Sequence, residues 1–150
     1  MGSGYGPGIA EVPGTSTSIE YIVLCIFKKD YFNGNYTVTT DTWADYNLTD
    51  ATPDLVRVEP GAGINQISVS AYPSSAFGSN RKPMKIDVDP ATFEATVPEQ
   101  VIGDYDGSPP GATARGTGKV NPCGDKITLL LTINIGGDDV AVDQVLVLEK

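Results

Sequence analysis

The sequence predicts an all-β fold, an antiparallel meander of eight to ten strands that closes into a small up-and-down barrel, with a β-sandwich as the second choice. Three observations predict this class. Apolar residues alternate with period two from residue 19 onward, the 150 residues include 17 Gly and 11 Pro, and the loops between strands are short. Strands joined by such loops must be antiparallel neighbours. Successive short connections leave few chances for a crossing, which favours the barrel.

The composition divides the chain into two parts. Residues 1–18 are mostly Gly, Pro, Ser and Thr, with Glu11 as the only charged side chain, and this composition is typical of a flexible leader. Residues 19–150 are expected to form a single β domain, because domains cluster at roughly 100–150 residues.

The clearest strand is 127–135, in which branched apolar residues share one face and mostly polar residues share the other. The predicted inward residues of this strand are Ile127, Leu129, Leu131, Ile133 and Ile135. By the same alternation, the other inward residues are Tyr36, Val38 and Thr40 in 35–41, Ile67, Val69 and Ala71 in 66–71, Met84, Ile86 and Val88 in 84–88, and Phe93, Ala95 and Val97 in 93–97. Shorter candidates are 54–59 and 99–105.

Two further strands have unusual compositions. Residues 112–120 are weakened as a strand by Gly116 and Gly118, which predicts a bend or bulge there. The last strand, 142–148, is apolar on both faces, so it is expected to be covered on both sides or to lie centrally in a sheet. The predicted turns are 89–92, 121–125 and 136–139, and the stretch 41–50 can hold one short helical turn.

The charge and the missing histidine exclude several functions. The chain has 10 Lys and Arg against 19 Asp and Glu, and the net charge of −9 disfavours nucleic acid and anionic membranes as partners. It has no His, which removes the usual general base and the commonest metal ligand. No nucleophile elbow, phosphate loop or metal motif is present. We therefore expect no catalytic residues, no metal, no cofactor and no enzyme activity.

No stretch of the sequence is long and apolar enough for a membrane helix. The most apolar run is 19–27, which is too short to span and contains Glu20. Its cysteine, Cys25, lies in a predicted strand, whereas Cys123 lies in a predicted turn. The sequence leaves open whether the two cysteines pair, because it does not fix the distance between them.

Three patterns resemble small surface lipoproteins of gut Bacteroidales that carry a lipocalin-like β domain. They are Phe-Asn-Gly-Asn-Tyr-Thr-Val at 32–38, the Gly-Thr-Gly-Lys-Val and Cys-Gly-Asp-Lys-Ile-Thr-Leu segments within 116–129, and the final strand ending at 148–150. The resemblance covers about residues 30–150. It implies a domain that faces outward from the outer membrane or lies in the periplasm, with a lipid anchor ahead of the leader.

The candidate ligand site is the segment around the only Trp. Asp41, Trp43, Asp45 and Tyr46 combine aromatic rings, which can stack on sugars, with carboxylates that accept hydrogen bonds from hydroxyl groups. Tyr72 and Phe77, in the long loop 72–83, could form a second wall. The alternative is that Trp43 packs in the core, and we expect this outcome because the modest inward residues of 35–41 leave volume for a large neighbour.

Acidic pairs suggest a weaker calcium alternative, since Ca²⁺ takes 6–8 oxygen ligands. The candidates are Asp87, Asp89, Asp104 and Asp106. Solubility and turn formation also explain these residues.

We expect a non-catalytic, extracytoplasmic surface domain, monomeric, that binds glycan or a cell-surface protein. An alternative is a structural or assembly subunit of fimbrial type, which exchanges the terminal strand 142–149 between protomers. A third is a glycan-active enzyme, because two carboxylates at about 5–10 Å can hydrolyse a glycosidic bond.

Overall fold

The computed structural model describes residues 25–150, and the predicted leader, residues 1–18, lies outside them. Eight strands follow one another within this part of the chain: β1 (Gly34–Asp41), β2 (Leu55–Pro60), β3 (Gln66–Ser70), β4 (Met84–Val88), β5 (Glu94–Gly103), β6 (Ala112–Val120), β7 (Lys126–Ile135) and β8 (Asp138–Glu149). The same residues contain four 3₁₀ turns: η1 (Lys29–Phe32) precedes β1, and η2 (Trp43–Tyr46), η3 (Ser75–Asn80) and η4 (Tyr105–Gly107) lie in connections between strands. Among residues 25–150, no helix has the length and apolar character needed to cross a membrane.

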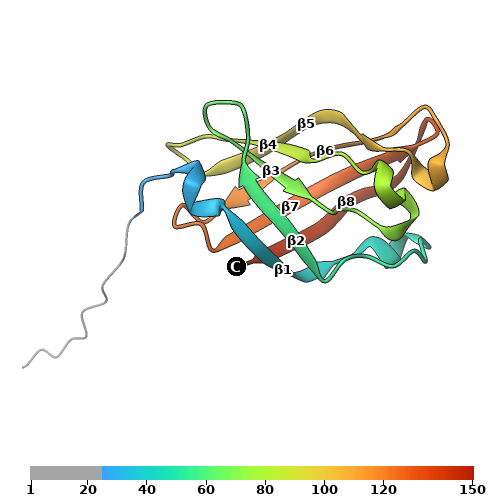
Figure 1. The fold of residues 1–150 in the computed structure, drawn as a ribbon, viewed down its shortest axis with the longest axis horizontal. Coiled ribbons are helices and arrows are strands. Elements are labelled where there is room, and N and C mark those ends of the chain that lie inside the picture. The colour runs from blue at the N-terminus through green and yellow to red at the C-terminus, as the bar shows by residue number, and fades with distance from the viewer. Residues whose placement is uncertain (1–24) are drawn as a thin grey trace, which may run out of the picture.

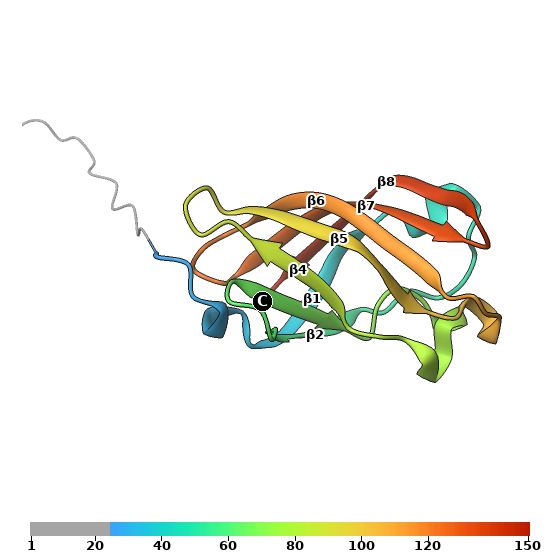
Figure 2. The ribbon, with the colours of Figure 1, turned by 90° about the horizontal axis from the view of Figure 1, so that it is seen from above.

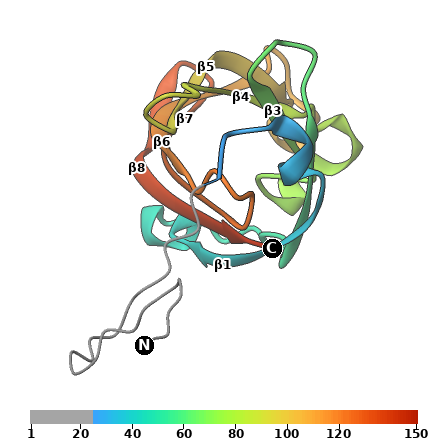
Figure 3. The same ribbon diagram turned by 90° about the vertical axis from the view of Figure 1, so that its left-hand side faces the viewer.

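Each strand pairs antiparallel with the next, and β8 pairs with β1, so the sheet is a closed barrel in strand order. The predicted up-and-down barrel is therefore confirmed over the sandwich. Figure 3 shows the barrel end-on, with the strands arranged around its axis. Side chains fill the interior of the barrel. The inward residues of β7 from Ile127 to Ile133, for example, are fully buried.

Because the strands alternate in direction, the connections alternate between two ends of the barrel. We call one end the terminal pole: it holds residues 25–33, the connections 61–65, 89–93 and 121–125, and the C-terminus. We call the other end the loop pole: it holds the connections 42–54, 71–83, 104–111 and 136–137. Figure 1 shows the terminal pole on the left and the longer connections of the loop pole on the right.

The strand count is eight because two predicted strands, 93–97 and 99–105, are one strand, and because residues 25–28 are not in a strand, although a strand was expected at Cys25. β5 runs through both, and its register with β6 shifts between Val97 and Gln100. Pro98 lies at this shift, where it has no N–H to give to the ladder. The predicted irregularity at Gly116 and Gly118 is therefore misplaced by one strand, because both glycines keep regular pairing partners on β5 and β7.

Two residues that were expected to point inward, Thr40 and Ala71, are exposed instead. Thr40 is exposed because the β1–β8 register shifts between Val38 and Thr40. Ala71 is exposed because β3 ends at Ser70 and Ala71 has a left-handed φ of 73°. Phe93 also has a positive φ, 65°, and belongs to the β4–β5 turn, but its half-buried ring still packs against the core.

The terminal pole is closed by the segment that precedes β1. Phe27 and Phe32 are buried, with ring centroids 5.5 Å apart. The hydroxyl of Tyr36 donates to the carbonyl of Gly124 in the β6–β7 turn. The cysteines do pair: a disulfide joins Cys25 to Cys123, with the two Cα atoms 5.1 Å apart. The segment 25–33 is thus held across this end of the barrel, as the view in Figure 2 also shows.

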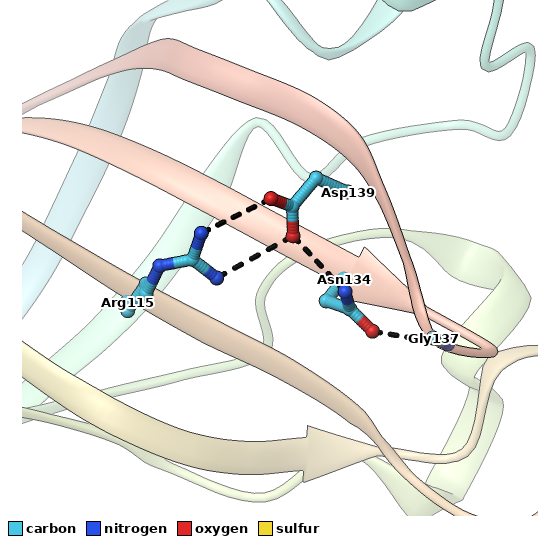
Figure 4. A network of polar contacts seen from close by, with 4 residues as sticks. All are labelled: Arg115, Asn134, Gly137 and Asp139. Atoms are coloured by element: carbon cyan, nitrogen blue, oxygen red, sulfur yellow. Dashed lines mark hydrogen bonds and ion pairs between the residues drawn. The ribbon is translucent and has the colours of Figure 1, made fainter.

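The terminal strand β8 is bonded on both edges, to β7 and to β1, so it lies centrally in the closed sheet as expected. Its turn with β7 is held by a polar network (Figure 4). Arg115 on β6 donates to Asp139 at 3.1 and 3.4 Å, the Asn134 amide donates to the same carboxylate at 3.0 Å, and the N–H of Gly137 donates to Asn134. Hydrogen bonds from Arg115, above all, lower the pKa of Asp139.

Candidate functional site

The aromatic residues of the predicted platform are mostly inside the barrel. Trp43 begins η2 and its side chain is 1% exposed, and Tyr72 and Phe77 are equally buried. These three residues therefore offer no ring face to a ligand from solvent. For Trp43, this is the expected outcome, in which its side chain packs in the core. Tyr46 is half-buried, and its hydroxyl donates to the carbonyl of Val142 at 2.5 Å.

Two other members of the predicted platform have different surroundings. Asp45 lies in η2 and is exposed. Asp41, at the end of β1, is half-buried, and its Oδ1 atom accepts hydrogen bonds from the backbone N–H of Trp43 at 3.0 Å and from the Gln144 amide at 2.7 Å. The predicted site is thus split between the surface of the loop pole and its interior.

A buried polar group connects Asp41 to the loop 71–83. The Gln144 side chain is fully buried, and its Nε2 atom also donates to the hydroxyl of Tyr72 at 2.5 Å. Burial raises the pKa of Asp41, although these hydrogen bonds lower it again in part. Burial, together with the charge of Asp41, raises the pKa of Tyr72 well above its usual value. Among the side chains of residues 25–150, three polar atoms are buried without a hydrogen-bond partner: Asp41 Oδ2, Trp43 Nε1 and Gln144 Oε1.

Sequence reasoning missed Gln144, although a signal was present. Gln144 has the same parity as Leu146 and Leu148, so the alternation of β8 already places it on the buried face. A polar residue on such a face requires a partner, because burying an unpaired amide is costly. That requirement would have directed attention to Asp41 and Tyr72.

The surface of the loop pole is acidic. The carboxylates in or beside its connections are Asp41, Asp45, Asp50, Asp54, Asp104, Asp106, Asp138 and Asp139, against Arg81 and Lys82 in the same connections. Two of these carboxylates have partners on the surface: Asp139 pairs with Arg115, and Asp50 accepts from the hydroxyl of Tyr105 at 2.5 Å. The hydrogen bond to Asp50, more than burial, raises the pKa of the Tyr105 hydroxyl to about 12.

A small hollow opens on this acidic surface. Its volume is about 190 Å³, and it is lined by Tyr105, Asp106, Ser108, Pro109, Pro110, Ala112, Ile135 and Gly136. The ring of Tyr105 is held edge-on against Phe77, with centroids 5.6 Å apart. The hollow is therefore lined by an aromatic ring, by apolar side chains and by the carboxylate-bearing Asp106. Of its lining residues, only Asp106 was a candidate site residue from the sequence, and it was a candidate for calcium.

The calcium candidates do not form one cluster. Asp87 and Asp89 lie near the terminal pole, whereas Asp104 and Asp106 lie at the loop pole. Asp87 accepts from the Gln66 amide at 2.9 Å, and Asp89 accepts from the N–H of Ala91 at 2.8 Å, as a turn residue does. Within residues 25–150, no three Asp, Glu, Cys or His side chains are gathered as a metal site.

Comparison of the chain with models of protein families, with curated proteins and with solved structures finds no match. The assignment of a function therefore depends on the geometry of the barrel and its two poles.

Proposed function

We propose that this protein is a non-catalytic, extracytoplasmic recognition domain that binds a basic protein partner at its acidic loop pole. The leader, residues 1–18, would hold the domain from the terminal pole, so that the loop pole faces the partner. The observation that carries the proposal is the placement of the acidic connections and their hollow at the end of the barrel opposite Cys25, where the described chain begins.

The chemistry of the hollow favours a lysine or arginine side chain as the group it receives. The aliphatic stem of such a side chain can pack on Pro110, Ile135 and the ring of Tyr105, while its charged end meets Asp106. The surrounding carboxylates add long-range attraction, which mainly raises the rate of association.

The extracytoplasmic location is supported by the disulfide between Cys25 and Cys123, since disulfides persist mainly in oxidising compartments. The resemblance to Bacteroidales surface lipoproteins suggests a lipid anchor ahead of the leader as the means of display. A strand-exchanging subunit is less well supported, because both edges of β8 are already hydrogen-bonded within the same chain.

The proposal is tested by measuring the binding of fluorescent oligolysine and oligoarginine peptides to the full chain by anisotropy. A loop-pole variant carries Asp104→Asn, Asp106→Asn and Asp138→Asn. A matched terminal-pole variant carries Asp87→Asn, Asp89→Asn and Asp125→Asn, so both lose the same charge. At about 0.5 kcal/mol for each exposed pair, the loop-pole variant should bind roughly tenfold more weakly.

The terminal-pole variant should bind nearly as the parent does. Equal weakening of the two variants would mean that net charge alone attracts the peptides, and the proposed site would be abandoned. A glycan array serves as the second arm. Specific glycan signals without any peptide binding would overturn the protein partner and favour the glycan alternative.

A further inference from the structure

A second and larger hollow lies on the outer face of the barrel, away from the loop pole. Its volume is about 600 Å³, and it is lined by Glu94, Ala95 and Thr96 of β5, Thr117, Gly118 and Lys119 of β6, and Thr128 and Leu130 of β7. We call it the outer groove. Leu130 is 43% exposed in it, although a leucine on a strand is ordinarily covered.

Beneath the outer groove, β6 has glycine at two successive positions of its inward face, Gly116 and Gly118, which alternate with the buried Ala114 and Val120. Gly116 pairs with Leu131 of β7, and Gly118 pairs with Leu129. A Cβ atom at Gly116 would lie 2.0 Å from the carbonyl oxygen of Leu130, and one at Gly118 would lie 2.0 Å from that of Thr128. Only glycine at these two positions therefore permits the close approach of β6 and β7. The backbone of Gly118 forms part of the floor of the groove.

The disulfide brings the preceding part of the chain to the same pair of strands. Cys123 lies in the β6–β7 turn, and its bond to Cys25 fixes the chain there. Residues 19–24, Ile-Glu-Tyr-Ile-Val-Leu, come directly before Cys25 and belong to the most apolar run of the sequence. Six residues reach at most about 20 Å when extended.

The groove is within that reach. Lys119 and Thr128 are four and five residues from Cys123 along the hairpin, which corresponds to roughly 13–17 Å in strand conformation. Because the disulfide attaches the segment so close to the groove, the effective concentration of the segment at the groove is of the order of millimolar. Weak apolar contacts with Leu130 and the threonine methyl groups are then sufficient for occupancy.

We propose that the outer groove is the docking site for residues 19–24 of the same chain. The apolar side chains of this segment cover Leu130, and Glu20 is the residue of the segment that can pair with Lys119. Glu94, Lys119 and Thr128 of the groove lie next to the strand ends of the terminal pole, so the docked segment keeps the start of the leader at this end of the barrel. The groove is thus an interaction surface whose partner is carried by the protein itself.

Proteolysis with a glutamyl endopeptidase tests the proposal, because the first 24 residues contain two glutamates, Glu11 and Glu20. Cleavage of the full chain is followed by mass spectrometry, and each rate is divided by the rate in a free peptide of residues 1–24. In the parent, the bond after Glu20 should be cut about tenfold more slowly than the bond after Glu11. Equal normalised rates at the two bonds would overturn the proposal.

Two variants then locate the contact. Leu130→Asp should remove the protection of the Glu20 bond, while the matched change Val142→Asp, at a residue 49% exposed on β8, should leave it intact. Melting curves of both variants establish that the barrel remains folded. Protection that survives Leu130→Asp would contradict docking in the outer groove. Protection that disappears on dilution would contradict docking within one chain and indicate a second copy as the partner.

Discussion

Trp43 is the largest side chain among the most deeply buried residues, and it shows why a single residue can decide between two functions. Its side chain is 1% exposed, so we predict that Trp43→Ala costs about 3–5 kcal/mol of unfolding free energy, the usual range for emptying a buried aromatic position. Chemical denaturation measures this cost. The control is Tyr31→Ala, since Tyr31 is 40% exposed, and it should cost much less. If the unfolding free energy of Trp43→Ala is close to that of the parent, Trp43 does not pack in the core and belongs to a ligand-binding surface.

Asp41 makes stability depend on pH in a direction opposite to that of a surface carboxylate in an ion pair. Burial raises its pKa in the folded chain above the ordinary value of about 3.9. An acid with a raised pKa destabilises the fold once it is ionised, so its contribution falls as pH rises through the folded pKa. Asp41→Asn keeps an oxygen for both hydrogen bonds and removes the charge.

We therefore predict that Asp41→Asn is more stable than the parent at pH 7 and that the difference disappears below about pH 3.9. Urea denaturation of both proteins at the two pH values measures it. The exposed Asp139, whose pKa is lowered by Arg115, supplies the contrast: Asp139→Asn should lose stability at pH 7. A difference between Asp41→Asn and the parent that does not change with pH would contradict the burial of the charge.

The residues of the site were only partly predictable. Composition identified the acidic and aromatic segment at 41–46, but period-two alternation cannot tell whether a loop residue such as Trp43 folds inward. The hollow beside Tyr105 and Pro110 escaped notice because it joins η4 to the β7–β8 turn, which are distant in sequence. Only the closure of the barrel brings these segments together.

At the scale of the strand, β7 allows a test with two adjacent leucines. Leu131 is fully buried and Leu130 is 43% exposed. Leu131→Asp should unfold the domain, because an isolated charge cannot remain buried without a partner. Leu130→Asp should stay within about 1 kcal/mol of the parent, as surface changes usually do. Thermal melts compare the two, and similar melting temperatures would show that the faces of β7 were assigned incorrectly.

Alternation predicted the strands well where the residues of the strand itself keep their alternation, as in β4 and in β7, whose pairing with β6 is regular throughout. It failed at Thr40 and at the junction of 93–97 with 99–105, because a β-bulge adds one residue and reverses the parity of all that follow. Pro98 marks one of these two bulges in the sequence. No comparable residue marks the other, between Val38 and Thr40, so the sequence could not have located it.

For the whole molecule, the disulfide is a large constraint on the unfolded chain, since it spans 98 residues. The chain-entropy model gives about 4.7 kcal/mol for a loop of roughly 100 residues. We predict that replacing both Cys25 and Cys123 by Ser lowers the unfolding free energy by several kcal/mol, measured in denaturant. Reductant should shift the parent toward the variant and leave the variant unchanged. A parent insensitive to reductant would indicate that the two cysteines do not pair.

The central claim is that the loop pole is the binding surface, and nuclear magnetic resonance tests it most directly. An unlabelled oligolysine peptide is titrated into the ¹⁵N-labelled chain while the amide signals are followed. We predict that the signals that move belong to 45–54, 104–111 and 136–139, the connections that carry the carboxylates and the hollow. Shifts spread evenly over both poles, or confined to 61–65, 89–93 and 121–125, would contradict the claim.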